Sequence, residues 1–82
     1  MYTYKTHGTC SRQINFDVVD GKLTNVSFVG GCNGNLQGIS ALVEGMLVDE
    51  AIARLNGISC NGRPTSCPDQ LSQALLQYKS QN

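Results

Sequence analysis

Hydrophobic and polar residues alternate along the first third of the chain with the period of two that is typical of half-buried β-strands. Residues 2–6 alternate tyrosine with threonine and lysine and predict a short strand, in which Lys5 favours a position at the sheet edge. Ile14, Phe16 and Val18 alternate with polar residues in the same way. This second stretch therefore predicts a strand with one apolar face.

The dipeptide Asp20-Gly21 follows and predicts a β-hairpin into a third strand. A two-residue turn at this point would place Ile14 opposite Ser27 and mix the apolar and polar faces. A three-residue loop over residues 19–21 instead places Ile14 opposite Val26, so that the apolar faces of the two strands coincide. The pattern favours the three-residue loop.

The rest of the chain changes to the spacing of three to four residues that predicts amphipathic helices. Apolar stripes with this spacing cover residues 36–46, 48–55 and 71–78. Gly45 is expected to end the first helix and Gly57 the second. Strands followed by helices predict one α+β domain over residues 1–82, with a small antiparallel sheet of about three strands and three helices packed on one face.

Charge and length limit the classes of function. Six basic and six acidic residues are spread along the chain and give zero formal net charge, so nucleic acid is not an expected partner. Residues 1–7 contain no apolar signal region, and no run reaches the length of a membrane span, so we expect a cytoplasmic protein without a membrane partner. A chain of 82 residues has a small core that often needs a metal or another cross-link.

The cysteines carry the most distinctive chemistry of the chain. Each lies in or beside a predicted loop: Cys10, Cys32, Cys60 and Cys67. Because the cytoplasm is reducing, such cysteines are better explained as metal ligands, redox groups or buried thiols than as disulfides. Loops at the ends of a sheet can converge, so the four thiolates predict a tetrahedral metal site, with zinc as the ordinary ion. The chain has no C-x-x-C pair, and the cysteine spacing matches no standard zinc ribbon.

The stretch Thr65-Ser66-Cys67-Pro68-Asp69 predicts the start of the last helix. Ser66 is a good N-cap, Pro68 falls in the first turn, and Asp69 stands where a carboxylate can close a capping box. Cys67 is then the first helical residue, where the helix dipole favours a thiolate. A thiolate is the form of cysteine that binds metals and attacks electrophiles.

This pentapeptide resembles the motif that gives the TSCPD family its name, and the segment Gly30-Gly31-Cys32-Asn33-Gly34-Asn35-Leu36 resembles the second signature of that family. The likeness covers nearly the whole chain. It implies that the four cysteines bind a metal, with iron or an iron–sulfur cluster as an alternative to zinc. The glycines of this segment, Gly30, Gly31 and Gly34, are themselves expected to shape the loop that presents Cys32. TSCPD domains also occur at the C-terminus of some adenosylcobalamin-dependent ribonucleotide reductases, so the resemblance implies a ribonucleotide reductase as partner.

Two other functions fit the same residues. Cys60 and Cys67 are the closest pair in sequence and could act as a thiol redox partner of a ribonucleotide reductase, in which one thiolate attacks and the other resolves. Free cysteines are also among the most buried residues, so inert thiols in a structural interaction domain are a third interpretation. The observation that decides among them is whether the sulfur atoms gather around one point.

Overall fold

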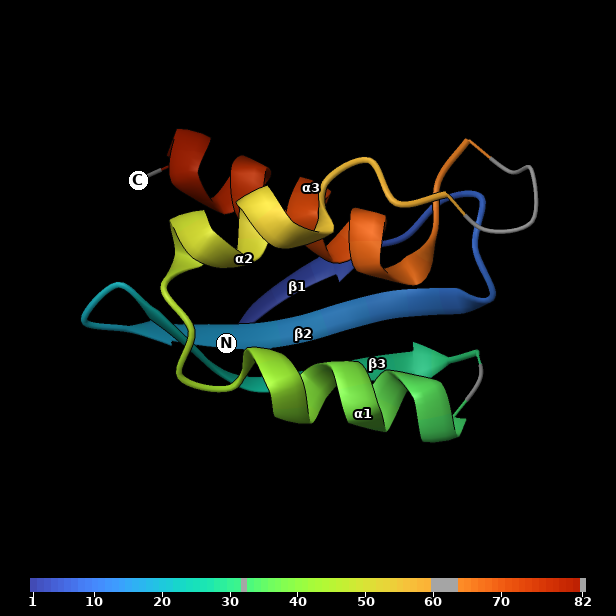
Figure 1. Ribbon diagram of the computed structural model, residues 1–82, viewed down its shortest axis with the longest axis horizontal. Helices are drawn as coiled ribbons and strands as arrows, with labels where there is room; N and C mark the ends of the chain where they lie inside the picture. Colours follow the sequence, from blue (N-terminus) through green and yellow to red (C-terminus); the bar gives the residue numbers. More distant parts are fainter. Residues whose placement is uncertain (32, 60–63, 82) are drawn as a thin grey trace.

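The computed structural model describes residues 1–31, 33–59 and 64–81. Its elements follow in the order β1 (Tyr2–Lys5), β2 (Ser11–Val19), β3 (Lys22–Gly30), α1 (Asn33–Val43), α2 (Val48–Leu55) and α3 (Cys67–Gln81) (Figure 1). The predicted α+β class is confirmed, because the three strands form one antiparallel sheet in the order β1-β2-β3 and the helices follow them. None of the helices in the described ranges combines the length and apolar composition that crossing a bilayer requires.

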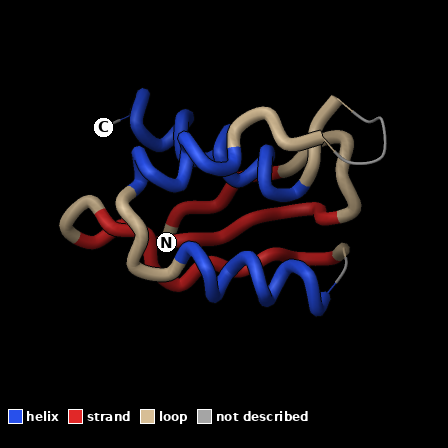
Figure 2. Tube along the Cα trace, viewed as in Figure 1, coloured by secondary structure: helices blue, strands red, loops and turns tan. Residues whose placement is uncertain are grey.

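The helices form a second layer against the apolar face of the sheet (Figure 2). Helix α1 packs against β3, α3 packs against β2, and α2 lies beside α3. Ile14 and Phe16 of β2 are fully buried in the same cluster as Leu71 and Leu75 of α3. The stripe that sequence predicted for the last helix is therefore part of the core.

The β2–β3 hairpin differs from the predicted register. A two-residue turn at Asp20-Gly21 closes it, and both residues have positive φ angles, of 53° and 75°. The apolar faces still coincide because β3 carries one extra residue around Asn25, whose φ is 53°, so that Ile14 lies opposite Phe28. The three-residue loop over residues 19–21 was wrong because an alternation pattern does not reveal a β-bulge in the partner strand.

The turn between α1 and α2 lies along the outer edge of β3. The Leu23 N–H donates to the Met46 carbonyl at 2.8 Å, and the Gly45 N–H donates to the Leu23 carbonyl at 2.7 Å. The Asn25 N–H donates to the Glu44 carboxylate at 3.0 Å. The first half of the outer edge of β3 is therefore occupied by the chain's own turn. The same contacts hold the C-terminal end of α1 against β3.

Candidate thiol site

Two of the cysteines lie at the end of the molecule where the β1–β2 loop meets the start of α3. Cys10 is exposed in that loop, and Cys67 is the half-buried first residue of α3. Both line one hollow of about 530 Å³. Its remaining wall is largely apolar and includes Leu36, Ile39, Leu42, Ile58 and Pro68.

The hydroxyl of Ser11, the first residue of β2, reaches the sulfur of Cys67. Ser11 is buried, and its Oγ lies 3.2 Å from Cys67 Sγ. The Thr9 Oγ1 lies 3.2 Å from the Ser11 Oγ and 3.3 Å from the Ser11 carbonyl oxygen, to which it can donate. The Thr9 hydroxyl, the Ser11 hydroxyl and the Cys67 sulfur therefore lie in series, each within hydrogen-bonding distance of the next.

The polar side chains of the motif tie the end of α2 to the start of α3. Ser66 caps the start of α3 as predicted. Its Oγ accepts the Asp69 N–H at 3.1 Å, and the same hydroxyl donates to the Ile58 carbonyl at 2.6 Å. The Asp69 carboxylate does not close the predicted capping box. It accepts the Gly57 N–H at 2.7 Å and the Thr65 hydroxyl at 2.6 Å, because the turn after α2 brings that N–H within reach.

Gln70 joins the same turn of α3 to the loop that carries Cys10. Its Oε1 accepts the His7 N–H at 2.9 Å, and its Nε2 donates to the Thr65 hydroxyl at 3.0 Å. Gly8 has a φ of 72°, and a Cβ added there would lie 3.2 Å from the Thr65 methyl carbon. The β1–β2 loop therefore rests directly on the motif, which fixes the chain on either side of Cys10.

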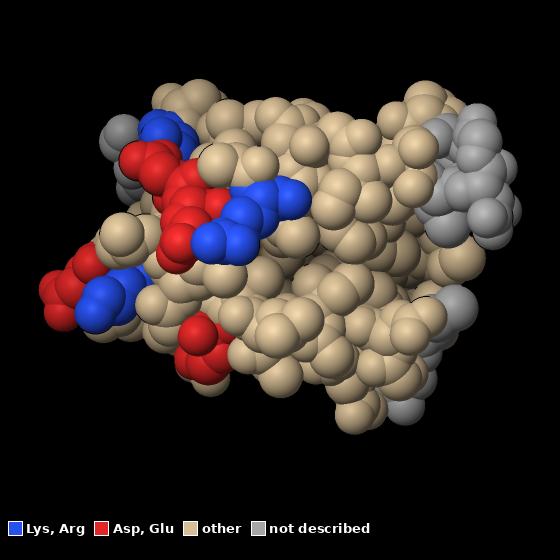
Figure 3. Space-filling view, viewed as in Figure 1, with Lys and Arg blue, Asp and Glu red and all other residues tan. Residues whose placement is uncertain are grey.

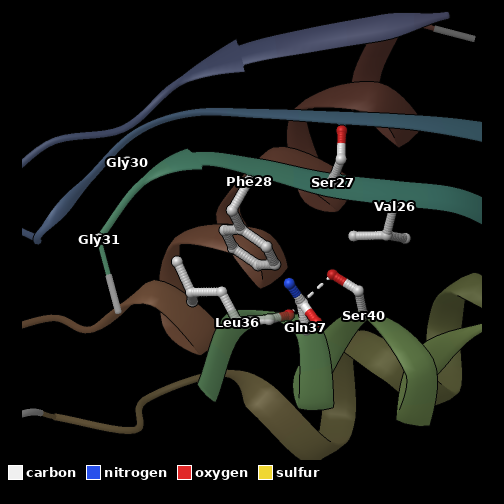
Figure 4. Close-up of a pocket in the computed structure, with 8 residues that line it drawn as sticks. All are labelled: Val26, Ser27, Phe28, Gly30, Gly31, Leu36, Gln37 and Ser40. Atoms are coloured by element: carbon white, nitrogen blue, oxygen red, sulfur yellow. Dashed lines mark hydrogen bonds between the residues drawn. The ribbon is translucent and has the colours of Figure 1, made fainter. Parts of the chain in front are cut away.

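A smaller hollow of about 300 Å³ lies between β3 and α1 (Figure 4). Val26 and Phe28 extend from β3 toward α1, whereas Ser27 points away (Figure 4). Leu36 lines both hollows and leaves little room at Gly31, where an added Cβ would lie 2.8 Å from Leu36 Cδ1 and where φ is 84°. The predicted need for glycine in this loop is explained at that residue.

The charged side chains visible on one face of the molecule gather away from the thiol hollow, over α2 and the β2–β3 turn (Figure 3). Lys79 pairs there with Asp49, and Arg54 pairs with Glu50 at 3.4 Å. Of the described residues that line the hollow, none carries a formal charge. The described surroundings of the two thiols are therefore uncharged and largely apolar.

The hydrogen bonds to Asp69 set its ionisation. Burial has the largest single effect and would raise the pKa of this carboxyl, but hydrogen bonds led by those from the Thr65 hydroxyl and the Gly57 N–H together outweigh it and hold the pKa below the ordinary value of 3.8. Because the pKa is lower in the folded state, ionised Asp69 favours folding. This contribution is complete above the pKa of the unfolded chain and is lost as the pH falls through the lower pKa of the folded chain.

We therefore expect acid to destabilise the domain partly through Asp69. The urea midpoint of the wild type should fall as the pH is lowered from about 5 to about 2.5, and the Asp69→Asn variant should show a flatter dependence because it has no proton to bind. Circular dichroism measures both midpoints, since the chain has no tryptophan. Equal pH slopes for the two proteins would contradict this role of Asp69.

The predicted ligand set is placed only in part. Cys10 and Cys67 face the same hollow, whereas Cys32 and Cys60 lie outside the described residues. The lining of the hollow includes Gly34 and Asn35, which follow Cys32 in sequence, and Ser59, which precedes Cys60. Within the described part of the chain, no three His, Cys, Asp or Glu side chains converge as metal ligands. The two placed thiols thus form half of the predicted set.

Three residues of this site carry no mark in the sequence. Ser11 and Thr9 flank Cys10, and a hydroxyl beside a cysteine is too common to be a signal. Gln70 is buried although it is polar, and only its place beside the apolar stripe of the last helix could have drawn attention to it. The contacts of Ser11 and Gln70 join segments that are more than fifty residues apart in sequence.

A family model described as the TSCPD domain matches residues 2–79. The chain belongs to the TSCPD domain family. The comparisons with curated proteins and with solved structures give no significant match. Because the family match runs from β1 into the last turns of α3, the TSCPD domain here comprises the sheet and all three helices. The pentapeptide connects the turn after α2 to the start of α3.

Proposed function

We propose that this TSCPD domain is a metal-binding module in which Cys10, Cys32, Cys60 and Cys67 supply thiolate ligands to a zinc or iron ion. The observation that supports the proposal is the common hollow of Cys10 and Cys67, which is also lined by residues within two or three positions of Cys32 and by the residue before Cys60 in sequence.

The chemistry of the described donors fits such an ion. Two thiols in an uncharged, largely apolar hollow suit zinc or iron, whereas magnesium and calcium require oxygen ligands. A bound ion would supply a cross-link between the β1–β2 loop and α3. Two residues at the start of α3 hold the thiols in place, because Gln70 fixes the loop of Cys10 and Ser66 caps the helix of Cys67.

Metal analysis of protein purified without added metal tests the proposal. We expect about one equivalent of zinc or iron in the wild type and less than about 0.2 equivalents in the Cys10→Ser and Cys67→Ser variants. The Cys32→Ser and Cys60→Ser variants test the remaining two ligands in the same way. A wild type with less than about 0.2 equivalents of any transition metal, and with all four thiols titratable, would exclude this function.

A thiol redox partner of a ribonucleotide reductase is the second candidate. It is favoured by the position of Cys67 at the first residue of α3, with the Ser11 hydroxyl against its sulfur. In that case mass mapping of the oxidised protein recovers a Cys60–Cys67 disulfide, and the reduced protein holds no metal. The same purified sample therefore separates the two functions, and co-purification with a ribonucleotide reductase tests the partner.

A further inference from the structure

We infer that Ser11 is a positioning residue for the Cys67 sulfur, because its hydroxyl donates a hydrogen bond to the thiolate that binds the ion. The inference rests on the proposed function and adds to it a hydrogen-bond donor that contacts a ligand of the ion rather than the ion itself. The distance of 3.2 Å between Ser11 Oγ and Cys67 Sγ is within hydrogen-bonding range for sulfur. Ser11 retains only 4% of its surface, so water does not compete freely for this hydroxyl.

Counting protons fixes the direction of the bond. A thiolate has no proton and can only accept, so the single proton of the Ser11 hydroxyl must point to Cys67 once its sulfur is ionised. Thr9 can then turn its own proton from the Ser11 carbonyl to the Ser11 Oγ, which lies 3.2 Å away. Two hydroxyls in series thus stabilise one negative charge, and hydrogen bonds to charged acceptors are the stronger kind.

The main chain holds this donor in place. The Ser11 carbonyl accepts the Thr6 hydroxyl at 2.5 Å, and Ser11 pairs with Gly30 across the sheet. A Cβ added at Gly31 would lie 3.2 Å from the Ser11 nitrogen, so Gly31 packs closely against the main chain of Ser11. The hydroxyl is therefore fixed before any ion binds, as expected of groups that orient metal ligands.

Titration with Co²⁺ tests the inference in the metal-bound protein. The Ser11→Ala variant should bind Co²⁺ about tenfold more weakly, and its sulfur-to-cobalt charge-transfer band should move to lower energy because the thiolate loses a hydrogen bond. The Ser11→Thr variant keeps a hydroxyl and should restore both values. Ser40→Ala is the matched control, because this hydroxyl bonds the Leu36 carbonyl at 2.8 Å and is not a lining residue of the thiol hollow.

A second measurement uses protein stripped of metal. At one fixed pH, the Ser11→Ala variant should be alkylated by iodoacetamide about fivefold more slowly at Cys67, with no change at Cys10, as mass spectrometry of the labelled peptides reports. If this variant does not fold, Thr9→Val replaces it and should slow the labelling of Cys67 about twofold.

The outcomes separate the two ideas. A wild type that binds no Co²⁺ while Ser11→Ala still slows labelling of Cys67 removes the metal function and keeps the donor role of Ser11. A wild type that binds Co²⁺ while the folded Ser11→Ala variant matches it in affinity, spectrum and labelling rate overturns the inference alone. Equal labelling of Cys67 in the wild type and in Thr9→Val overturns it where Ser11→Ala does not fold.

Discussion

Replacing Asp69 by alanine is expected to lower the free energy of unfolding by about 3–5 kcal/mol. The substitution removes two hydrogen bonds to a charged acceptor, from the Gly57 N–H and the Thr65 hydroxyl, and such bonds contribute about 1.5–3 kcal/mol each. A domain of this size has a total stability of only about 4–12 kcal/mol. The variant should therefore be partly unfolded at 37 °C, as urea titration followed by circular dichroism will measure.

The matched control for this prediction is Asp49→Ala. Asp49 is also an acidic residue of a first helical turn, but it is exposed and pairs with Lys79 at the surface. Its loss should change the free energy of unfolding by less than about 1 kcal/mol. The role given to Asp69 is wrong if both variants unfold within about 0.5 kcal/mol of the wild type.

Removal of the metal is expected to have a comparable or larger effect if the proposed function holds. An ion present at about a thousand times its dissociation constant adds about 4 kcal/mol to the stability of the folded chain. For a domain of this length, the melting temperature should then fall by about 15–30 °C when a chelator strips the ion. The physical reason is that the unfolded chain no longer holds the thiols close together.

The Cys67→Ser variant provides the control for chelation. It should melt at the temperature of the stripped wild type, and chelator should not lower that temperature further. Returning zinc to the stripped wild type should restore its melting temperature, whereas the variant should not respond. A melting temperature of the wild type that chelator leaves unchanged speaks against a structural ion.

The fold was largely predictable because each element has a local signal. Alternation marked β2, the spacing of Leu71 and Leu75 marked α3, and Gly57 marked the end of α2, where its φ is 87°. The hairpin register was not predictable, because the bulge at Asn25 is stabilised by the Glu44 carboxylate from a distant turn. Such a tertiary contact leaves no trace in a local pattern.

Of the predicted site residues, Cys10 and Cys67 line one hollow, whereas the residues that support these two thiols were not predicted. The predicted helix start singled out Cys67, and the structure shows that Cys10 lines the same hollow. The capping box assigned to Asp69 was incorrect, because the carboxylate has a better-placed donor in the turn after α2. The hydroxyl of Ser11 could not be foreseen, since its contact with Cys67 joins residues 56 positions apart.

The turn that lies along the outer edge of β3 also limits how copies of this protein can associate. A bare strand edge is a template on which a second chain can add a strand and begin a fibril. Here Met46, Gly45 and Glu44 already bind the main-chain groups of Leu23 and Asn25. Self-assembly by strand addition is therefore blocked along this stretch of β3.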